Sequence, residues 1–327
     1  MRQEVADKSS PTLKGPSVPA KNFAFRAENA LPPVVSTTLP RAAPVFFWML
    51  VVLAGGLGLR CIHIGPADFG RLDALLLAGA GAMAAAVFLH ASLTFSIRAA
   101  VVLLAISLLF SFAAECSGVL WGVPFGARYV YNAEFTPKVA GLVPVFVCLA
   151  WFVLSYGPLV LLREFALAWR GARWSRLLAK ALLLSVVLAS ADLYLDPLAV
   201  SLGAWRWEGG GIYFGVPLSN FLGWFATACA IYVPFLALGL DSTPGAATRS
   251  RLDPMLASAG LVFKAMALAA AVKATQSCVP AVLTLAAMAP YAKFWLSALR
   301  GAPGIPKARV RGELSKDYKK SATLSDV

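Results

Sequence analysis

The chain contains few charged residues. Only 14% of its 327 residues are Asp, Glu, Lys or Arg, whereas 59% are hydrophobic, and the mean hydropathy is +0.72. A soluble domain has about 25% charged and about 45–50% apolar residues. The shortage of charge therefore excludes a soluble globular enzyme and a disordered chain. It indicates a membrane protein that crosses the bilayer several times.

The residue patterns that hold metals and cofactors are also missing. The two histidines, His63 and His90, are too few for a histidine-rich di-iron centre, and the five cysteines are scattered without a CxxC pair. The sequence contains neither the glycine fingerprint of a dinucleotide-binding fold nor a phosphate-binding P-loop. The sequence therefore indicates no histidine-rich metal centre, no zinc site and no nucleotide-binding motif.

Long apolar runs dominate the sequence. Each run is close to the roughly 20 residues that a helix needs to cross a bilayer. The runs are residues 44–59, 72–91, 98–114, 141–162, 177–195, 220–240, 255–275 and 279–299. They predict an all-α fold, a polytopic membrane helix bundle with about eight transmembrane helices. Seven is the alternative if the last two runs form one hairpin.

The distribution of positive charge predicts how the chain is oriented. Residues 44–299 form the predicted transmembrane domain, and residues 1–43 and 300–327 form flexible and basic tails. Of 29 Lys and Arg residues, 21 fall on the side of the two tails and 6 on the other side. We therefore predict a multi-pass protein of the cell (inner) membrane with both termini in the cytoplasm. The net charge of +13 then reflects topology, and no nucleic acid is expected as a partner.

Two polar connections, 115–140 and 192–220, fall on the same non-cytoplasmic side in this topology, and both carry motifs. In the first, Glu115 follows an apolar run and precedes Tyr129 and Tyr131. An ionisable residue at membrane depth is a functional candidate, because its burial is costly. The alternative for the tyrosines is an aromatic belt at the membrane interface.

The second connection begins with two acidic residues. Asp192 and Asp196 are four residues apart, so a helix places both on one face. Two carboxylates so close in a low-dielectric site do not both ionise, and the neutral one can donate a proton. Pro197 marks the end of the helix or a kink. Alternatively, Asp196 caps a turn, and Arg206 is the counter-ion of Asp192 or Glu208.

The second connection is also rich in aromatic residues. Flat aromatic faces can bind an apolar ligand or stabilise a cation, although an aromatic belt at the interface is again the alternative. Asn220, at the head of the next apolar run, needs a hydrogen-bond partner and can orient a water molecule. The aromatic residues are Trp205, Trp207, Tyr213, Phe221 and Trp224.

These motifs resemble the membrane carotenoid-biosynthesis proteins that include the carotenoid 1′,2′-hydratases, such as γ-carotene 1′-hydratase and bisanhydrobacterioruberin hydratase. The resemblance covers roughly residues 45–300 and is sharpest over 115–224. The matching segments are Glu115…Gly122-Val-Pro-Phe-Gly126…Tyr129-x-Tyr131, Asp192…Asp196-Pro197, Trp205-x-Trp207 and Gly211-x-Tyr213-x-Gly-Val-Pro217-x-x-Asn220-Phe-x-Gly-Trp224.

The resemblance implies addition of water to the terminal C1′=C2′ double bond of a linear (ψ) carotenoid end, giving a tertiary hydroxyl without a cofactor. It implies a carotenoid substrate within the bilayer and other carotenoid-biosynthesis enzymes as partners. Protonation of the alkene then needs an acid, Asp192 or Asp196, and a group such as Glu115 or Glu208 to take the proton of the attacking water. The residues expected to bind substrate are Tyr129, Tyr131, Trp205, Trp207, Tyr213, Asn220 and Trp224.

Two other functions remain as alternatives. One is a non-catalytic carotenoid- or lipid-binding membrane protein, which needs the aromatic residues but not several acids. The other is a small-molecule transporter, which favours broken helices and polar residues in several spans. The acids of this chain cluster near one interface, and that clustering favours the hydratase.

Overall fold

The computed structural model describes residues 47, 49–53, 56, 69–164, 172–242, 264–265 and 267–289. All of them belong to one compact unit, Val34–Val327. The predicted tails, 1–43 and 300–327, lie outside the described residues, as does much of the first, seventh and eighth predicted spans. The domain boundaries therefore stay predictions.

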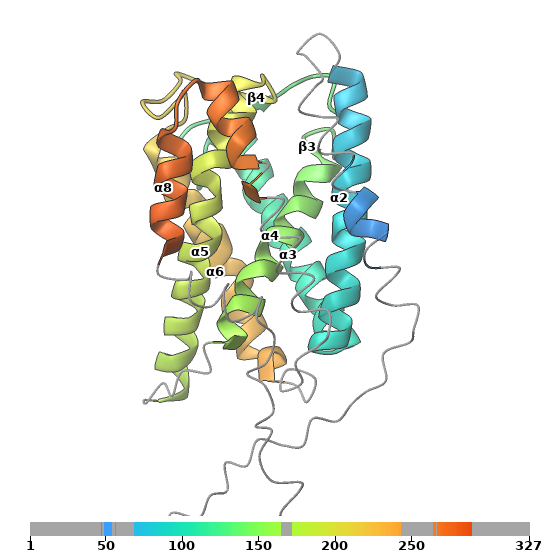
Figure 1. The fold of residues 1–327 in the computed structure, drawn as a ribbon. Helices are drawn as coiled ribbons and strands as arrows, with labels where there is room; N and C mark the ends of the chain where they lie inside the picture. The colour runs from blue at the N-terminus through green and yellow to red at the C-terminus, as the bar shows by residue number, and fades with distance from the viewer. Residues whose placement is uncertain are drawn as a thin grey trace, which may run out of the picture. The chain divides into compact units, whose positions relative to one another are not determined.

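The described part of the chain is mainly helical, as predicted (Figure 1). Its named helices are α2 (Phe69–Thr94), α3 (Ile97–Trp121), α4 (Val145–Glu164), α5 (Arg173–Ser201), α6 (Leu218–Ala237) and α8 (Val279–Met288). Among the described residues, four segments are long and apolar enough to cross a membrane: Asp73–Thr94, Ile97–Trp121, Arg173–Ser201 and Leu218–Ala237. Two further apolar helical segments, Val145–Val160 and Val279–Met288, are shorter. The fold is that of an α-helical membrane protein, and the number eight stays a prediction.

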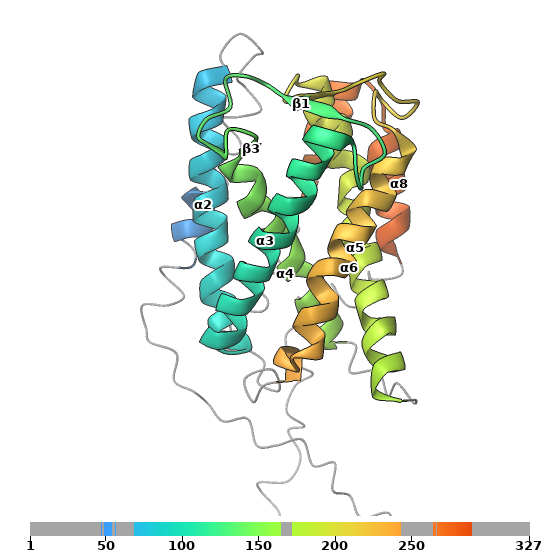
Figure 2. The same cartoon turned by 180° about the vertical axis from the view of Figure 1, so that it is seen from behind.

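The helices pack against one another in two overlapping groups. Helices α2, α3 and α4 contact each other, while α5 packs on α4, α6 and α8. Helix α3 also contacts α6, and the view from behind shows α3 between α2 and α6 (Figure 2). The inner faces of α3, α5 and α6 therefore meet in the interior of this unit.

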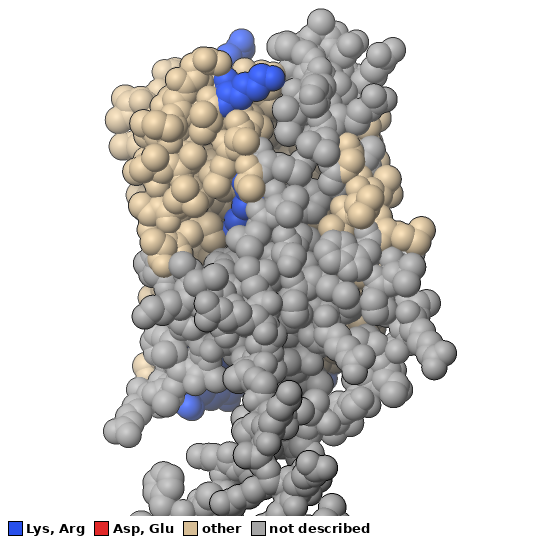
Figure 3. Space-filling view, viewed as in Figure 1, with Lys and Arg blue, Asp and Glu red and all other residues tan. Residues whose placement is uncertain are grey.

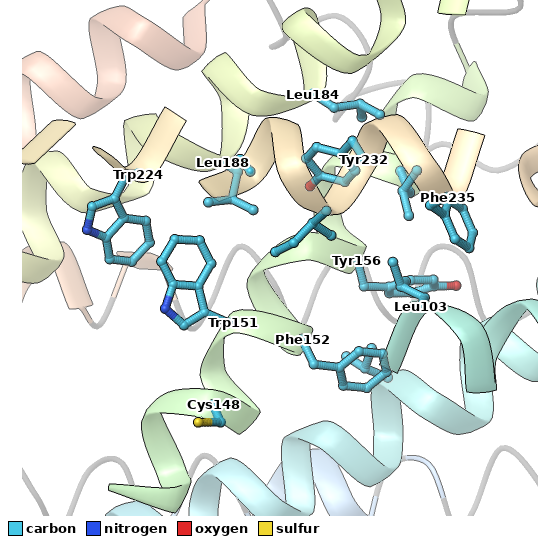
Figure 4. Close-up of a cluster of buried hydrophobic side chains, with 14 of the residues drawn as sticks. Leu103, Cys148, Trp151, Phe152, Tyr156, Leu184, Leu188, Trp224, Tyr232 and Phe235 are labelled. Atoms are coloured by element: carbon cyan, nitrogen blue, oxygen red, sulfur yellow. The ribbon is translucent and has the colours of Figure 1, made fainter. Parts of the chain in front are cut away.

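The inner face of α3 is narrow and partly polar. Ser107, Ser111 and Glu115 recur every four residues and are buried together with Leu103 and Gly118. Small residues on one helical face let neighbouring backbones approach closely, as in other membrane helices. Larger side chains of α4, α5 and α6 fill the space between these helices (Figure 4). On the face shown in Figure 3, the described surface is mostly uncharged, with a few Lys and Arg side chains.

The predicted end of the third span is wrong, and of the two alternatives for Pro197 the structure excludes the helix end. Helix α3 does not close near residue 114 but continues to Trp121, where Gly122 adopts a left-handed conformation (φ 78°) and its N–H donates to the carbonyl of Gly118. Helix α5 passes through Pro197 and continues to Ser201. In both helices, the carboxyl groups near the predicted ends accept hydrogen bonds from residues elsewhere in the chain, which lets these groups stay buried within longer helices.

Short strands, which were not predicted, join the two motif-rich connections. Strand β1 (Tyr129–Tyr131) pairs antiparallel with β4 (Trp205–Trp207), so that Tyr129 lies opposite Trp207 and Tyr131 opposite Trp205. A second pair forms between β2 (Lys138–Val139) and β3 (Val143–Pro144). Pairing of β1 with β4 brings both connections to the same end of the helices (Figure 2).

Candidate functional site

Glu115 is the centre of one half of the site. Its side chain is only 5% exposed, on the inner face of α3. Three groups donate hydrogen bonds to it: Trp151 Nε1 to Oε1 at 2.8 Å, the Tyr131 hydroxyl to Oε2 at 2.6 Å, and the Tyr129 hydroxyl to Oε2. Buried carboxyl groups need such partners, and an acceptor with three donors suits the ionised form.

The two tyrosines remain hydrogen-bond donors at neutral pH. Burial raises the pKa of the Tyr129 and Tyr131 hydroxyls well above the ordinary phenol value, and the charge of Glu115 adds to this effect. A phenol with so high a pKa keeps its proton near pH 7. Both hydroxyls can therefore donate to Glu115 throughout the physiological range.

Gly118 leaves the room that Tyr129 needs. A Cβ atom at Gly118 would lie 2.6 Å from Phe125 Cδ2 and 2.7 Å from Tyr129 Cε1. Such distances are shorter than any ordinary contact, so only glycine lets these rings lie against α3 one turn after Glu115. This explains the spacing between Glu115 and Gly118 in the first motif.

Asp192 and Asp196 form the other half of the site. They are 0% and 2% exposed and lie on one face of α5, as their spacing predicts. The Asn220 amide nitrogen donates to Oδ2 of both, at 2.5 Å for Asp192 and 2.6 Å for Asp196. Trp205 Nε1 donates to Asp196 Oδ1 at 3.0 Å. Within the described part of the chain, Asp192 Oδ1 is buried and has no hydrogen-bond partner.

Aromatic rings connect the two halves. Trp151, which bonds Glu115, stacks on Trp224 with ring centroids 4.3 Å apart and an interplanar angle of 27° (Figure 4). Trp224 lies one helical turn after Asn220 on the buried face of α6. On the other side, the ring of Tyr131 lies 5.8 Å from that of Trp205. Glu115 and the two aspartates therefore belong to one aromatic-walled site, and they interact electrostatically.

Comparison with known proteins identifies the family of this chain. A family model described as "Carotenoid biosynthesis protein" matches residues 70–290, which is more than half of the chain and includes both halves of the site. The chain belongs to this family. The description of the family supports a role in carotenoid biosynthesis. The long apolar helices indicate a membrane protein.

Part of the chain also matches a curated protein whose name gives an activity. The chain is 31% identical over 144 residues to a protein named bisanhydrobacterioruberin hydratase from Haloarcula japonica. The match covers 44% of this chain and 46% of that protein, so it spans about half of the relative. No solved structure matches the chain. The comparisons therefore support a carotenoid hydratase-like membrane family.

Most of the residues predicted for the site of this carotenoid biosynthesis protein come together. The three buried acids Glu115, Asp192 and Asp196 lie among residues that were predicted to bind substrate. In the structure these residues donate hydrogen bonds to the acids or pack as aromatic rings around them. Trp207 lies against Tyr129, with ring centroids 4.7 Å apart. The predicted residues in this group are Tyr129, Tyr131, Trp205, Trp207, Asn220 and Trp224.

Glu208 is not part of the group. Its side chain is 48% exposed and forms an ion pair with Arg128, with Arg128 Nη2 2.8 Å from Glu208 Oε2. The alternative that Arg206 is the counter-ion of Glu208 is therefore not what the structure shows, because Arg128, next to β1, pairs with Glu208 at the end of the strand pair. The Tyr213 hydroxyl also points elsewhere, donating to the carbonyl of Leu193 at 2.8 Å.

Sequence reasoning missed Trp151. It lies in the second turn of α4, inside an apolar run, and the residues on either side of it are Ala150 and Phe152. A buried tryptophan N–H normally finds an acceptor, so an isolated tryptophan inside a span is itself a sign of a buried acceptor. Within the described residues, no group of three or more His, Cys, Asp or Glu could hold a metal ion.

Proposed function

We propose that the protein hydrates the linear (ψ) end of a carotenoid by adding water to its terminal C1′=C2′ double bond. The observation that carries the proposal is the buried carboxyl pair of α5. Its members share one amide donor, and one oxygen, Asp192 Oδ1, accepts no hydrogen bond from the described residues. The name of the Haloarcula japonica relative supports the same chemistry.

Asp192 is the general acid in this proposal. Its Oδ2 accepts from Asn220, so the transferable proton belongs on Oδ1, which accepts no hydrogen bond from the described residues. Transfer of this proton to C2′ breaks the π bond and leaves a tertiary cation at C1′. A positioned acid of this kind typically accelerates a reaction by about 10²–10⁴-fold.

Glu115 and the aromatic rings stabilise the cation. Three donors hold Glu115 as an acceptor, which fits a fixed negative charge facing the developing positive charge. The faces of Trp151 and Trp224, two buried and stacked rings, add cation–π attraction. Glu208 has no part in this scheme, because it lies at the surface with Arg128.

In the last step, a water molecule attacks the cation and the acid is regenerated. The oxygen of this water bonds to C1′, and one of its protons passes to the Asp192 carboxylate, which is restored to the acid form. The net change is one water added per modified end, and no redox partner or cofactor is required. The polyene lies among the helices within the bilayer, and its end reaches the site at the non-cytoplasmic interface of the inner membrane, with both termini cytoplasmic.

The proposal is tested by expression in a host that accumulates γ-carotene or lycopene. We expect the extracted pigments to gain one water per modified end, as measured by mass spectrometry. A protein that only binds carotenoid would leave the pigment mass unchanged at normal protein level, and that outcome would remove the hydratase assignment.

A further inference from the structure

Pro197 leaves one carbonyl of α5 without its usual donor. Proline has no backbone N–H, so Pro197 cannot donate to the carbonyl of Leu193, four residues earlier in the helix. Leu193 follows Asp192 directly, and Pro197 follows Asp196. The interrupted hydrogen bond therefore lies in the same turn that carries the carboxyl pair. Leu193 is partly buried, and a carbonyl shielded from water without a partner is destabilising, so another donor is expected there.

Tyr213 supplies that donor. Its hydroxyl donates to the carbonyl oxygen of Leu193 at 2.8 Å from a position 20 residues further along the chain. The ring packs edge-on against Phe221 of α6, with centroids 5.5 Å apart. Burial raises the pKa of Tyr213 to about 12. The hydroxyl therefore keeps its proton at neutral pH and stays a donor.

The loop around Tyr213 is built to hold this position. Tyr213 and Val216 exchange backbone hydrogen bonds, with N···O distances of 3.3 and 2.9 Å. A Cβ atom at Gly211 would lie 2.0 Å from the carbonyl carbon of Val216, so the loop closes only around glycine. The glycine-rich part of the second motif thus folds into a tight turn that presents Tyr213 to α5.

We propose that Tyr213 is a positioning residue, whose hydroxyl replaces the amide donor that Pro197 lacks and so fixes the turn of α5 that carries Asp192 and Asp196. The role rests on the proposed hydration. It differs from the substrate contact that the sequence predicts for Tyr213. Asn220 reaches both carboxyl groups at 2.5 and 2.6 Å, and both distances depend on the geometry of this one turn.

A double-mutant cycle tests this role. Tyr213→Phe removes the hydroxyl alone, and Pro197→Ala restores an N–H that can donate to Leu193. We expect Tyr213→Phe to lower kcat about tenfold, a change of about 1.4 kcal/mol in the barrier, with little change in KM, and to lower the Tm of the detergent-solubilised protein. The double variant should recover both kcat and Tm, because the helix then supplies the missing donor itself.

Tyr232→Phe is the matched control. The Tyr232 hydroxyl donates to the carbonyl of Ser155 in α4 at 2.8 Å, and it too is buried. We expect Pro197→Ala to give no recovery of Tm in the Tyr232→Phe background. Recovery there would show that Pro197→Ala stabilises the protein generally, and the proposed pairing of Tyr213 with Pro197 would be lost.

The remaining outcomes overturn the inference in distinguishable ways. A raised KM in Tyr213→Phe that Pro197→Ala does not correct would make Tyr213 a substrate contact. A neutral Tyr213→Phe, or the absence of any Tm coupling between the two positions, would remove the hydrogen-bond replacement. If the unmodified protein adds no water to any carotenoid, the proposed hydration fails, and the Tm cycle still decides whether Tyr213 replaces the donor.

Discussion

Asp192 and Asp196 are chemically identical but have different hydrogen-bond partners. Among the described side chains, Asn220 and Trp205 both donate to Asp196, whereas Asn220 is the one that donates to Asp192. Their common face was predictable from their spacing of four residues. The donors were not, because Trp205 lies on a separate strand and Asn220 on another helix. Local periodicity carries no information about such long-range contacts.

Replacing Asp192 or Asp196 by asparagine tests which of the two carboxyl groups donates the proton. We expect Asp192→Asn to reduce the hydration rate about 10²–10⁴-fold, because the amide keeps the size of the side chain but cannot transfer the proton. Asp196→Asn should reduce it less, since both Asp196 oxygens already accept hydrogen bonds. The measurement is the ratio of hydrated to unhydrated carotenoid at equal protein level.

Glu208→Gln is the control for this pair, because Glu208 is an acid of the same connection that lies at the surface. It should keep near-normal activity. If Asp192→Asn stays active while Glu208→Gln is inactive, the proton donor has been assigned to the wrong residue. Loss of the Asp192→Asn protein from the membrane would instead show that the carboxyl group is needed for folding.

At the level of helices and strands, apolar length predicted where the spans lie but not where they end. Glu115 resembles the end of an apolar run, yet α3 continues beyond it to Trp121. The helix can continue because Tyr129 and Tyr131 from β1 and Trp151 from α4 satisfy the carboxyl group inside the protein. The pairing of β1 with β4 depends on contacts between residues about 75 apart, which a single sequence does not reveal.

Gly118→Ala tests how closely β1 must approach α3. The added methyl group would overlap Phe125 and Tyr129, and overpacking of this kind costs about 1–3 kcal/mol. We expect a lower Tm and a hydration rate reduced about tenfold, because Tyr129 moves away from Glu115. Gly81→Ala in α2 is the matched control, since a Cβ atom there meets no other atom within 4 Å. Equal effects of the two variants would contradict the role of Gly118.

At the level of the whole molecule, the structure brings both motif-rich connections to one end of the helices. The prediction that this end faces away from the cytoplasm depends on the distribution of Lys and Arg. Ala133 and Ser201 are exposed residues of these two connections. Cysteines placed there, in a background without native cysteines, should both react with a membrane-impermeant thiol reagent in intact cells. Reaction only after lysis would place this end of the protein in the cytoplasm and reverse the predicted topology.

The origin of the new hydroxyl oxygen tests the central claim most directly. Cells that make γ-carotene or lycopene and express the protein would be incubated in ¹⁸O-labelled water, and the pigments analysed by mass spectrometry. The proposed mechanism predicts that the hydroxylated carotenoid carries the label from water and that ¹⁸O₂ supplied in unlabelled water leaves it unlabelled. Incorporation of label from ¹⁸O₂ would contradict hydration and show that the oxygen arrives by oxidation.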